Sequence, residues 1–339
     1  MGGDFGLRSS LPAAINCLER FPQLTLCLIG NAEQIRAELP VIHPRATIID
    51  AAQTVEMDDR PAHALRRKAQ SSMRIAIDLL AQGEVDAVVS AGNTGALMAM
   101  GLLVLKTLPG IERPAICTAI PTQRGHCWLL DLGANADCTA GQLQQFALLG
   151  SALAQSEGVA KPSVALLNIG SENGKGNEQV KQAAELLLQD SRLSYCGFIE
   201  GDTLFHGDVD VVVCDGFTGN VALKVSEGTA RLIAEKVRRQ FSKNAWTKIA
   251  GWMARPVLKA IYRELDPQQY NGACLLGLQG LVVKSHGSST VAGFENAIAR
   301  AVNAVEKNLT QLISQQLAQV SISANINDAP LKETGRGDE

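Results

Sequence analysis

Short apolar segments alternate along this chain with longer segments of helical periodicity, and this alternation constrains the fold more than any other feature. Several of the short segments are apolar almost throughout, which is typical of strands covered on both faces. The order strand, loop, helix, strand predicts an α/β fold with a mostly parallel sheet and helices on both faces. The expected strands are 24–29, 46–50, 87–90, 115–120, 127–131, 164–169, 209–214 and 281–284; the expected helices are 61–81, 95–105, 141–156, 178–188 and 220–240, and the last third is otherwise mostly helical.

The composition fits one large globular domain. The chain has 339 residues, of which 46% are hydrophobic and 19% charged, so it can bury a sizeable core and resembles neither a disordered nor a collagen-like chain. We expect a single α/β catalytic domain over residues 1–320, a helical hairpin inserted at about 240–265, and a flexible tail over residues 321–339. The net charge of −3 argues against a nucleic-acid partner.

No targeting or membrane-spanning segment is predicted. The first residues lack the basic and apolar regions of a signal peptide, and no apolar run approaches the roughly 18 residues that a membrane span needs. The eight cysteines form no Cys-x-x-Cys pair. We therefore expect buried, reduced thiols in a cytoplasmic protein, with no disulfide, metal or other cofactor.

Four loops of similar composition follow predicted strands and lead into predicted helices. Each contains glycine and asparagine, and two of them carry threonine. Glycine lets the backbone turn tightly, and the following helix offers free N–H groups and a positive dipole end to an anion. Lys175 is the one positive charge in these loops. The pattern predicts a site for phosphate, or for an oxyanion at a reacting carbonyl, at one edge of the sheet. The loops are residues 88–98, 130–137, 167–177 and 213–220.

Other interpretations of these loops remain open at this point. Glycine, asparagine and threonine are also ordinary turn and helix-cap residues, which explains any one loop taken alone. No Gly-x-Gly-x-x-Gly motif occurs, and the spacing from Gly170 to Lys175 is one residue short of a P-loop, so a nucleotide site is disfavoured. No catalytic serine or cysteine motif is found, and the best placed of five histidines, His286, is as a lone histidine more often structural. A reaction in which one bound substrate attacks another fits these features.

Eight blocks stand in order from residue 1 to about residue 300: MGGD at 1–4, SSM at 71–73, SAGNTGALM at 90–98, GIERP at 110–114, DLGAN at 131–135, DGFTGN at 215–220, YNGA at 270–273 and KSHG at 284–287. Together they closely resemble the phosphate acyltransferase family of bacterial phospholipid synthesis. The resemblance implies transfer of a fatty acyl group from acyl carrier protein to inorganic phosphate, which gives acyl phosphate for a downstream membrane acyltransferase. It also implies a homodimer, and a fold similar to the phosphotransacetylases and the isocitrate and isopropylmalate dehydrogenases.

The resemblance suggests a role for residues at matching positions. Lys175 would offset the charge of phosphate or of the oxyanion, and Asn220 would donate a hydrogen bond to the carbonyl oxygen. Asn93, Thr94 and Gly95 would cradle phosphate at a helix N-terminus. The further candidates are His286 as a third catalytic residue and Asn135, Asp215, Thr218 and Asn271 as substrate-binding residues.

The start of the chain departs from the family pattern. Residues 1–4 form a Gly-rich turn that normally follows a strand, and family members carry a short strand ending in Asp just before it. We expect that this first strand is missing here and that the centre of the sheet is affected; the alternative is that the turn simply opens the chain. The segment after Gly6 also lacks a proline that is common there, which we expect to have no effect.

A basic segment near residue 250 carries two of the three tryptophans. Residues 231–264 contain nine Lys or Arg against two Glu, and apolar residues including Trp246 and Trp252 recur at helical spacing. We expect Arg255-Pro256 to divide the segment into two helices. The pattern favours an interfacial hairpin on anionic lipid, and family members associate peripherally with membranes. Packing on a partner subunit or contact with the acidic carrier protein are the alternatives.

Two other function classes remain as alternatives to acyl-phosphate formation from acyl carrier protein. A short-chain phosphotransacetylase that uses coenzyme A would share the fold, but the basic hairpin argues against it. A non-catalytic membrane scaffold would not need four polar, Gly-rich loops.

Overall fold

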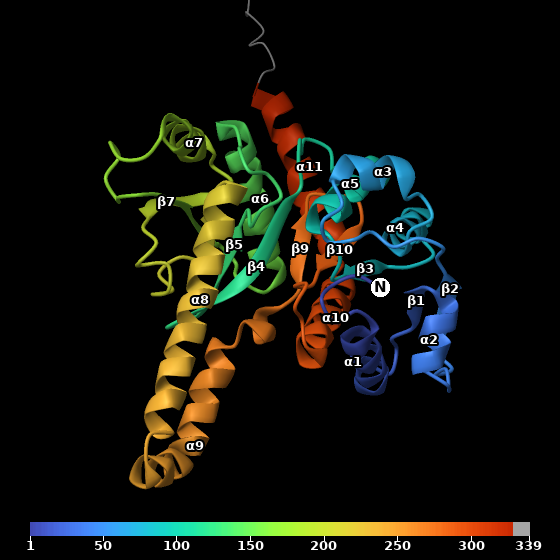
Figure 1. Ribbon diagram of the computed structural model, residues 1–339. Coiled ribbons are helices and arrows are strands. Elements are labelled where there is room, and N and C mark those ends of the chain that lie inside the picture. Colours follow the sequence, from blue (N-terminus) through green and yellow to red (C-terminus); the bar gives the residue numbers. More distant parts are fainter. Residues whose placement is uncertain (328–339) are drawn as a thin grey trace, which may run out of the picture.

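The computed structural model describes residues 1–327, in which ten strands and their helices form two sheets with covering layers (Figure 1). The strands are β1 (Leu26–Gly30), β2 (Ala46–Asp50), β3 (Ala87–Ser90), β4 (Ala115–Thr122), β5 (Gly125–Leu130), β6 (Ser163–Leu167), β7 (Ser194–Ile199), β8 (Val211–Val213), β9 (Ala273–Leu276) and β10 (Leu281–Lys284). The helices are α1 (Leu7–Arg20), α2 (Ala32–Glu38), α3 (Pro61–Arg67), α4 (Ser72–Gln82), α5 (Thr94–Val104), α6 (Ala140–Ser156), α7 (Glu178–Gln189), α8 (Gly216–Phe241), α9 (Ala245–Leu265), α10 (Val291–Glu306) and α11 (Leu309–Asn327), with a 3-10 turn at Pro267–Tyr270.

The main sheet has eight strands in the order β3-β10-β9-β4-β5-β8-β6-β7. The pair β3 and β10 is parallel, and so is the group β5, β8, β6 and β7, whereas β9 and β4 pair antiparallel with their neighbours. The prediction of an α/β fold with a mostly parallel sheet is confirmed. Because β4 and β5 form an antiparallel hairpin, the two parallel groups run in opposite directions. The four Gly-rich loops therefore do not leave the sheet at one edge, and that expectation is wrong.

One row of paired residues brings the strand ends together nevertheless. The row crosses the sheet and takes one residue from each of the strands β3, β10, β9, β4, β5, β8 and β6. Each parallel strand among these ends either at its residue in the row or one residue later. The carboxyl ends of β3 and β10 thus meet those of β5, β8 and β6 along one line, approached from opposite sides. The row is Val89, Val283, Cys274, Cys117, Leu130, Val213 and Leu166.

Helices cover both faces of this sheet because its central strands are apolar on both sides. Alternate strand residues such as Leu130 and Val213 join a core with α6, α7, α10 and α11. Their neighbours, such as Leu129 and Val212, join a second core with α3, α4 and α5. Asn93, Thr139 and Asp215 accept hydrogen bonds that cap α5, α6 and α8, which fixes where these helices begin after the strand loops.

The strands β1 and β2 form a separate parallel pair rather than part of the main sheet. A cavity of about 500 Å³ lies between β1 and β3, lined also by α1, α4 and α10. Met1 lines this cavity and would lie 2.4 Å from a Cβ at Gly30. The main sheet therefore ends at β3, and the cavity separates β3 from β1.

Three further details differ from expectation. The helix expected over 61–81 is two helices, because Ser71 caps a new one. Cys27 and Cys196 are exposed, whereas the other six cysteines are buried, and all eight are free. Residues 321–327, expected in a flexible tail, continue α11; the rest of that expected tail lies outside the described residues.

A helical hairpin projects from the body of the protein, but α8 and α9 form it over residues 216–265 rather than 240–265 (Figure 1). The chain turns at residues 242–244, where Asn244 and Thr247 form a capping box for α9. Pro256 lies inside α9, so the expectation of a break at Arg255-Pro256 is wrong. Within the described residues, no helix is both long and apolar enough to cross a membrane.

Candidate active site

The loop after β5 is organised by one buried carboxylate. Asp131 is fully buried and accepts hydrogen bonds from the backbone N–H groups of Ile116 (2.9 Å), Ala134 (3.1 Å) and Asn135 (2.7 Å). Burial raises its pKa, and these hydrogen bonds oppose the rise. Gly133, at the tip of the turn, has a φ of 117°, which an L side chain rarely adopts. Asp131 therefore acts on the shape of the loop rather than on a ligand.

Asn135 belongs to the same buried network. Its Nδ2 donates to the carbonyl of Pro114 (2.8 Å) and to Asp131 (3.0 Å), and its backbone carbonyl accepts from Gly216 N (2.7 Å). Its Oδ1 is buried and has no hydrogen-bond partner among the described residues. Asn135 thus ties the β5 loop to the start of α8.

The first turn of α8 is locked against the β5 loop. Asp215 accepts from Thr218 N and from the Thr218 hydroxyl, both at 2.8 Å, so these two predicted substrate-binding side chains are engaged with each other. A Cβ on Gly219 would lie 2.0 Å from the carbonyl oxygen of Asp131, so only glycine fits there. Asn220 follows and is exposed, with its side chain 3.6 Å from the Cβ position of Gly133. The Asn220 carboxamide is therefore free to meet a ligand.

Lys175 lies in the loop after β6, the strand beside β8. Asn168 holds this loop in shape, because its Nδ2 donates hydrogen bonds to the carbonyls of Gly170 (3.1 Å) and Lys175 (3.2 Å). The Lys175 side chain is exposed, and its amine forms no ion pair within residues 1–327. Lys175, on the loop after β6, and Asn220, near the start of α8 after the adjacent strand β8, thus both carry free polar groups within the described residues, although no hydrogen bond joins them.

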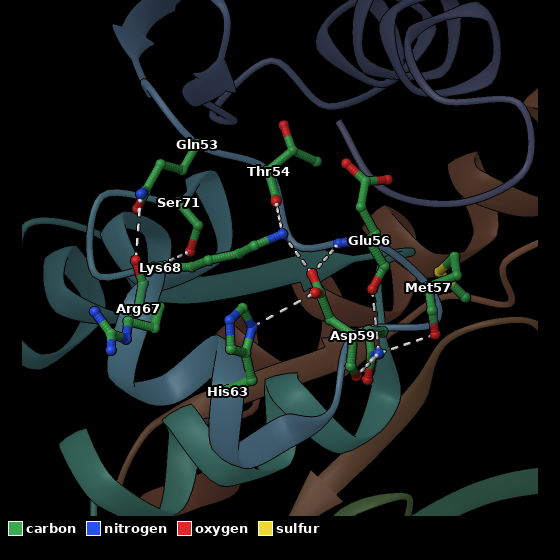
Figure 2. Close-up of polar contacts among 10 residues, drawn as sticks. Gln53, Thr54, Glu56, Met57, Asp59, His63, Arg67, Lys68 and Ser71 are labelled. Carbon is green, nitrogen blue, oxygen red and sulfur yellow. Dashed lines mark hydrogen bonds and ion pairs between the residues drawn. The ribbon is translucent and has the colours of Figure 1, made fainter.

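Asn93 holds a neighbouring loop in place. Its Nδ2 donates to the carbonyls of Glu56 (3.2 Å), Met57 (3.0 Å) and Asp59 (2.9 Å), while its Oδ1 accepts from Ala96 N. The carboxylate of Asp59 in turn accepts from Lys68 Nζ, as Figure 2 shows, and this pairing lowers the pKa of Asp59. The side chain of Asn93 is thus engaged in positioning residues 56–59.

The next two residues keep free donors. No hydrogen bond in the described chain uses the backbone N–H of Thr94 or Gly95, the first two residues of α5. Gly95 also lies against Pro61, whose Cγ would be 2.7 Å from a Cβ there. These two amides at a helix N-terminus are the part of the predicted phosphate cradle that remains available.

His286 is held by Asn271 at the end of β10. Asn271 accepts from the backbone N–H of His286 (2.8 Å) and donates to the hydroxyls of Ser285 (2.8 Å) and Ser289 (3.0 Å). His286 Nε2 lies 3.0 Å from Nζ of Lys224, which is one turn after Asn220 on α8. Burial lowers the pKa of His286, and the positive charge of Lys224 lowers it further. Asn271 is thus engaged in positioning, while the ring of His286 faces the site.

The predicted residues fall into two groups joined by α8. Asn135, Asp215, Thr218 and Asn220 lie where β5 and β8 end, with Lys175 on the neighbouring loop. Asn93, Thr94, Gly95, Asn271 and His286 lie where β3 and β10 end. The contact between Lys224 and His286 connects the two groups. Sequence reasoning missed Lys224, although its position four residues after Asn220 places both on one helix face.

Lys284 was also missed as a site residue, although it is a lysine at the end of an apolar strand. It is 8% exposed and donates to the carbonyl of Ser285, with Nζ 3.5 Å from the carbonyl of Ala91. Burial lowers its pKa to about 8, with a further contribution from Lys224. A buried amine therefore lies under the junction of the β3 and β10 loops.

The lowered pKa of Lys284 predicts a pH effect on stability. An unfolded lysine holds its proton to about pH 10.4, so from about pH 8 upward the unfolded state binds more protons than the folded state. The contribution of Lys284 to the free energy of unfolding therefore rises between about pH 8 and about pH 10.4, by at most about 3 kcal/mol. Urea unfolding of the wild type and of Lys284→Met between these pH values should show a wild-type gain that the variant lacks. Parallel pH dependences would contradict this account.

Comparisons with known proteins agree with this architecture. The sequence profile of the family described as "Fatty acid synthesis protein" matches residues 1–312. A phosphate acyltransferase from Pseudomonas syringae pv. syringae is 54% identical over 321 residues, 94% of each chain. One from Pseudomonas putida (strain KT2440) is 53% identical, covering 94% of this chain and 96% of its own.

Solved structures support the same fold. A phosphotransacetylase from Streptococcus pyogenes matches with a TM-score of 0.60 at 19% identity, covering 88% of this chain and 91% of its own. The EutD phosphotransacetylase from Staphylococcus aureus matches with a TM-score of 0.57 at 17% identity, covering 88% and 90%. At this identity the likeness concerns the fold alone, and it confirms the expected similarity to phosphotransacetylases.

Proposed function

Because this chain belongs to the fatty acid synthesis protein family, we propose that it is a phosphate acyltransferase that moves a fatty acyl group from acyl carrier protein to inorganic phosphate. The observation that carries this proposal is the 54% identity to a phosphate acyltransferase over 94% of both chains. The product, acyl phosphate, serves phospholipid synthesis. The free polar groups at the junction of the strand ends are suited to this reaction.

The reaction needs no nucleophile from the protein. An oxygen of HPO₄²⁻ attacks the thioester carbonyl carbon, the C–S bond breaks, and the phosphate proton ends on the released thiol. The two cysteines near the site do not compete, since burial raises the pKa of Cys138 to about 12 and that of Cys214 well above its usual value. What the protein must supply is position and charge for a bound phosphate.

We assign the roles from the free groups of the site. Asn220 donates to the carbonyl oxygen as it gains negative charge, and Lys175, on the adjacent loop, offsets that charge or the charge of phosphate. The backbone amides of Thr94 and Gly95 bind phosphate, and His286 faces the same space. Five further residues hold the loops that carry these groups: Asn93, Asn135, Asp215, Thr218 and Asn271.

The choice of acyl donor tests the proposal against its alternative. We expect the purified protein to form acyl phosphate from long-chain acyl carrier protein and phosphate, and to use acetyl-coenzyme A far less well. A preference for acetyl-coenzyme A would favour a short-chain phosphotransacetylase. Absence of turnover with every donor would favour a non-catalytic scaffold.

We further propose that the α8–α9 hairpin binds anionic membrane surfaces. Phe241 packs on Gly251 between the two helices, and the outer face of α9 carries the exposed side chains of Trp246 (81%) and Trp252 (73%). Lys and Arg outnumber Glu nine to two over residues 231–264. An apolar stripe flanked by basic residues is typical of helices that lie in the headgroup region.

Changing Trp246 and Trp252 together to Glu should abolish sedimentation with vesicles of anionic phospholipid, because it places two charges on the apolar stripe. Leu188→Glu on α7, where Leu188 is 73% exposed, is the matched control and should sediment as the wild type does. Unchanged sedimentation of the double variant would contradict membrane binding. A change in molecular mass by light scattering would instead indicate packing on a partner subunit.

The family resemblance supports three more proposals. We propose a homodimer, a cytoplasmic location with peripheral membrane association, and delivery of acyl phosphate to a downstream membrane acyltransferase. Light scattering of the purified protein tests the first of these directly.

A further inference from the structure

Two positively polarised groups meet face to face at the centre of the site. Nζ of Lys224 lies 3.0 Å from Nε2 of His286. On the other side of the ring, the backbone N–H of Ser288 donates to His286 Nδ1 at 3.1 Å. A backbone N–H can only donate, so we assign the lone pair to Nδ1, with the Ser288 hydroxyl 2.8 Å away donating to it as well, and the proton of the neutral ring to Nε2. Lys224 and His286 therefore both present N–H groups to the same small space.

Among the described residues, no neighbouring group places an acceptor between these two donors. The side chain of Lys224 is 51% exposed, and its nearest carboxylate, Glu227, is 3.8 Å away at one side. Lys284, buried at the end of β10, adds a further amine, and the positive charge of Lys224 acts on it. Asp4 and Glu227 are the carboxylates that offset the charge here. Donors that converge without an acceptor between them favour a bound anion.

Lys224 and His286 lie where the proposed reaction needs a bound phosphate. Lys224 lies one helical turn after Asn220, whose carboxamide is free at the β5 and β8 loops. The Ala91 carbonyl, 3.5 Å from Nζ of Lys284, lies three residues before Thr94, whose backbone amide is free. An anion that contacts both Lys224 and His286 from one side would thus lie near the proposed oxyanion donor and the proposed phosphate cradle.

We propose that Lys224 and His286 bind the phosphate that attacks the thioester, with Nζ and Nε2–H each donating to a phosphate oxygen. This inference rests on the proposed function and adds Lys224 to the residues that contact substrate. The ammonium group attracts the dianion, and the neutral ring orients it without holding a competing charge. Lys284 lies behind the pair and adds to the positive potential.

The test separates the two substrates kinetically. Initial rates of acyl-phosphate formation are measured with phosphate varied at saturating acyl carrier protein, and then with the carrier varied at saturating phosphate. Lys224→Met should raise KM for phosphate by about tenfold or more, because it removes a charged hydrogen bond. KM for the acyl carrier protein should change by less than about twofold. Lys224→Arg should recover most of the affinity, and the exposed Lys161→Met, before β6, serves as the matched control.

Phosphate binding can also be measured without turnover, which tests this inference separately from the proposed function. Phosphate that binds only the folded protein raises its Tm in proportion to the logarithm of its concentration. The wild type should show this rise even if no acyl donor is used, and Lys224→Met should lose most of it. Phosphate-dependent stabilisation in an enzyme without turnover would support the anion site while contradicting the proposed reaction.

Three outcomes would overturn the inference. An unchanged KM for phosphate in Lys224→Met would show that Lys224 does not bind it. A rise only in KM for the carrier would assign the pair to the phosphodiester of the carrier's thioester arm. Equal phosphate-dependent Tm shifts in the wild type and Lys224→Met would contradict a phosphate contact in the free enzyme.

Discussion

Replacing Asn220 or Lys175 by Ala should each reduce kcat for acyl-phosphate formation by at least about tenfold while the protein stays folded. Both side chains are exposed and make no hydrogen bond that the described fold needs. Asn220 lies beside Gly133 in the first turns of α8, where its Nδ2 can donate to a carbonyl oxygen that gains charge during the reaction. The loss should fall on kcat because this interaction strengthens in the transition state.

Conservative variants sharpen this prediction. Asn220→Asp keeps the size of the side chain but replaces the donor with a negative charge, so it should be at least as inactive as the Ala variant. Lys175→Arg should retain more activity than Lys175→Ala, and Lys161→Ala is the control for loss of an exposed lysine. Near wild-type kcat in both Asn220→Ala and Lys175→Ala, with intact circular dichroism spectra, would overturn the assignment.

Gly219→Ala should have the second large effect. The new Cβ would lie 2.0 Å from the backbone oxygen of Asp131 and 2.9 Å from Sγ of Cys214. Because a backbone oxygen cannot rotate away, the first turn of α8 must move off the β5 loop and carry Asn220 with it. We expect the free energy of unfolding to fall by about 1 to 3 kcal/mol and kcat to fall by about a hundredfold.

Gly228→Ala on the same helix is the matched control. A Cβ there meets nothing within 4 Å, so the variant should gain stability through helix propensity, by up to about 1 kcal/mol, with unchanged kcat. Urea unfolding and initial rates on both variants provide the comparison. If Gly219→Ala matches the wild type in both, the close contact between α8 and the β5 loop is not what positions Asn220.

The sheet strands were predictable because they are apolar on both faces and short. The periodicity located β3, β4, β5, β6, β8 and β10 to within a few residues. It did not reveal β7, which has six residues, or β9, which has four, nor the direction of each strand. Direction depends on the β4–β5 hairpin and on pairing between segments far apart in the sequence. That is why the four loops were expected at one edge, whereas they meet along a row approached from two sides.

Part of the site could also be predicted from the sequence. Gly-rich loops stand out in a sequence, and the family resemblance then pointed to Asn93, Asn220 and His286. Whether such a side chain is free is decided by its partners: the amide of Asn93 is engaged by three carbonyls, whereas no hydrogen bond within residues 1–327 engages that of Asn220. Lys224 lies inside a helix with no local motif, and only its contact with His286 reveals it.

Acyl transfer to phosphate is tested best by mass spectrometry of the products from purified protein, long-chain acyl carrier protein and ¹⁸O-labelled inorganic phosphate. Attack by phosphate should give acyl phosphate that retains all the labelled oxygen, in an amount equal to the free thiol released from the carrier. Release of thiol with free fatty acid but no acyl phosphate would show that water attacks instead, and would contradict acyl transfer to phosphate.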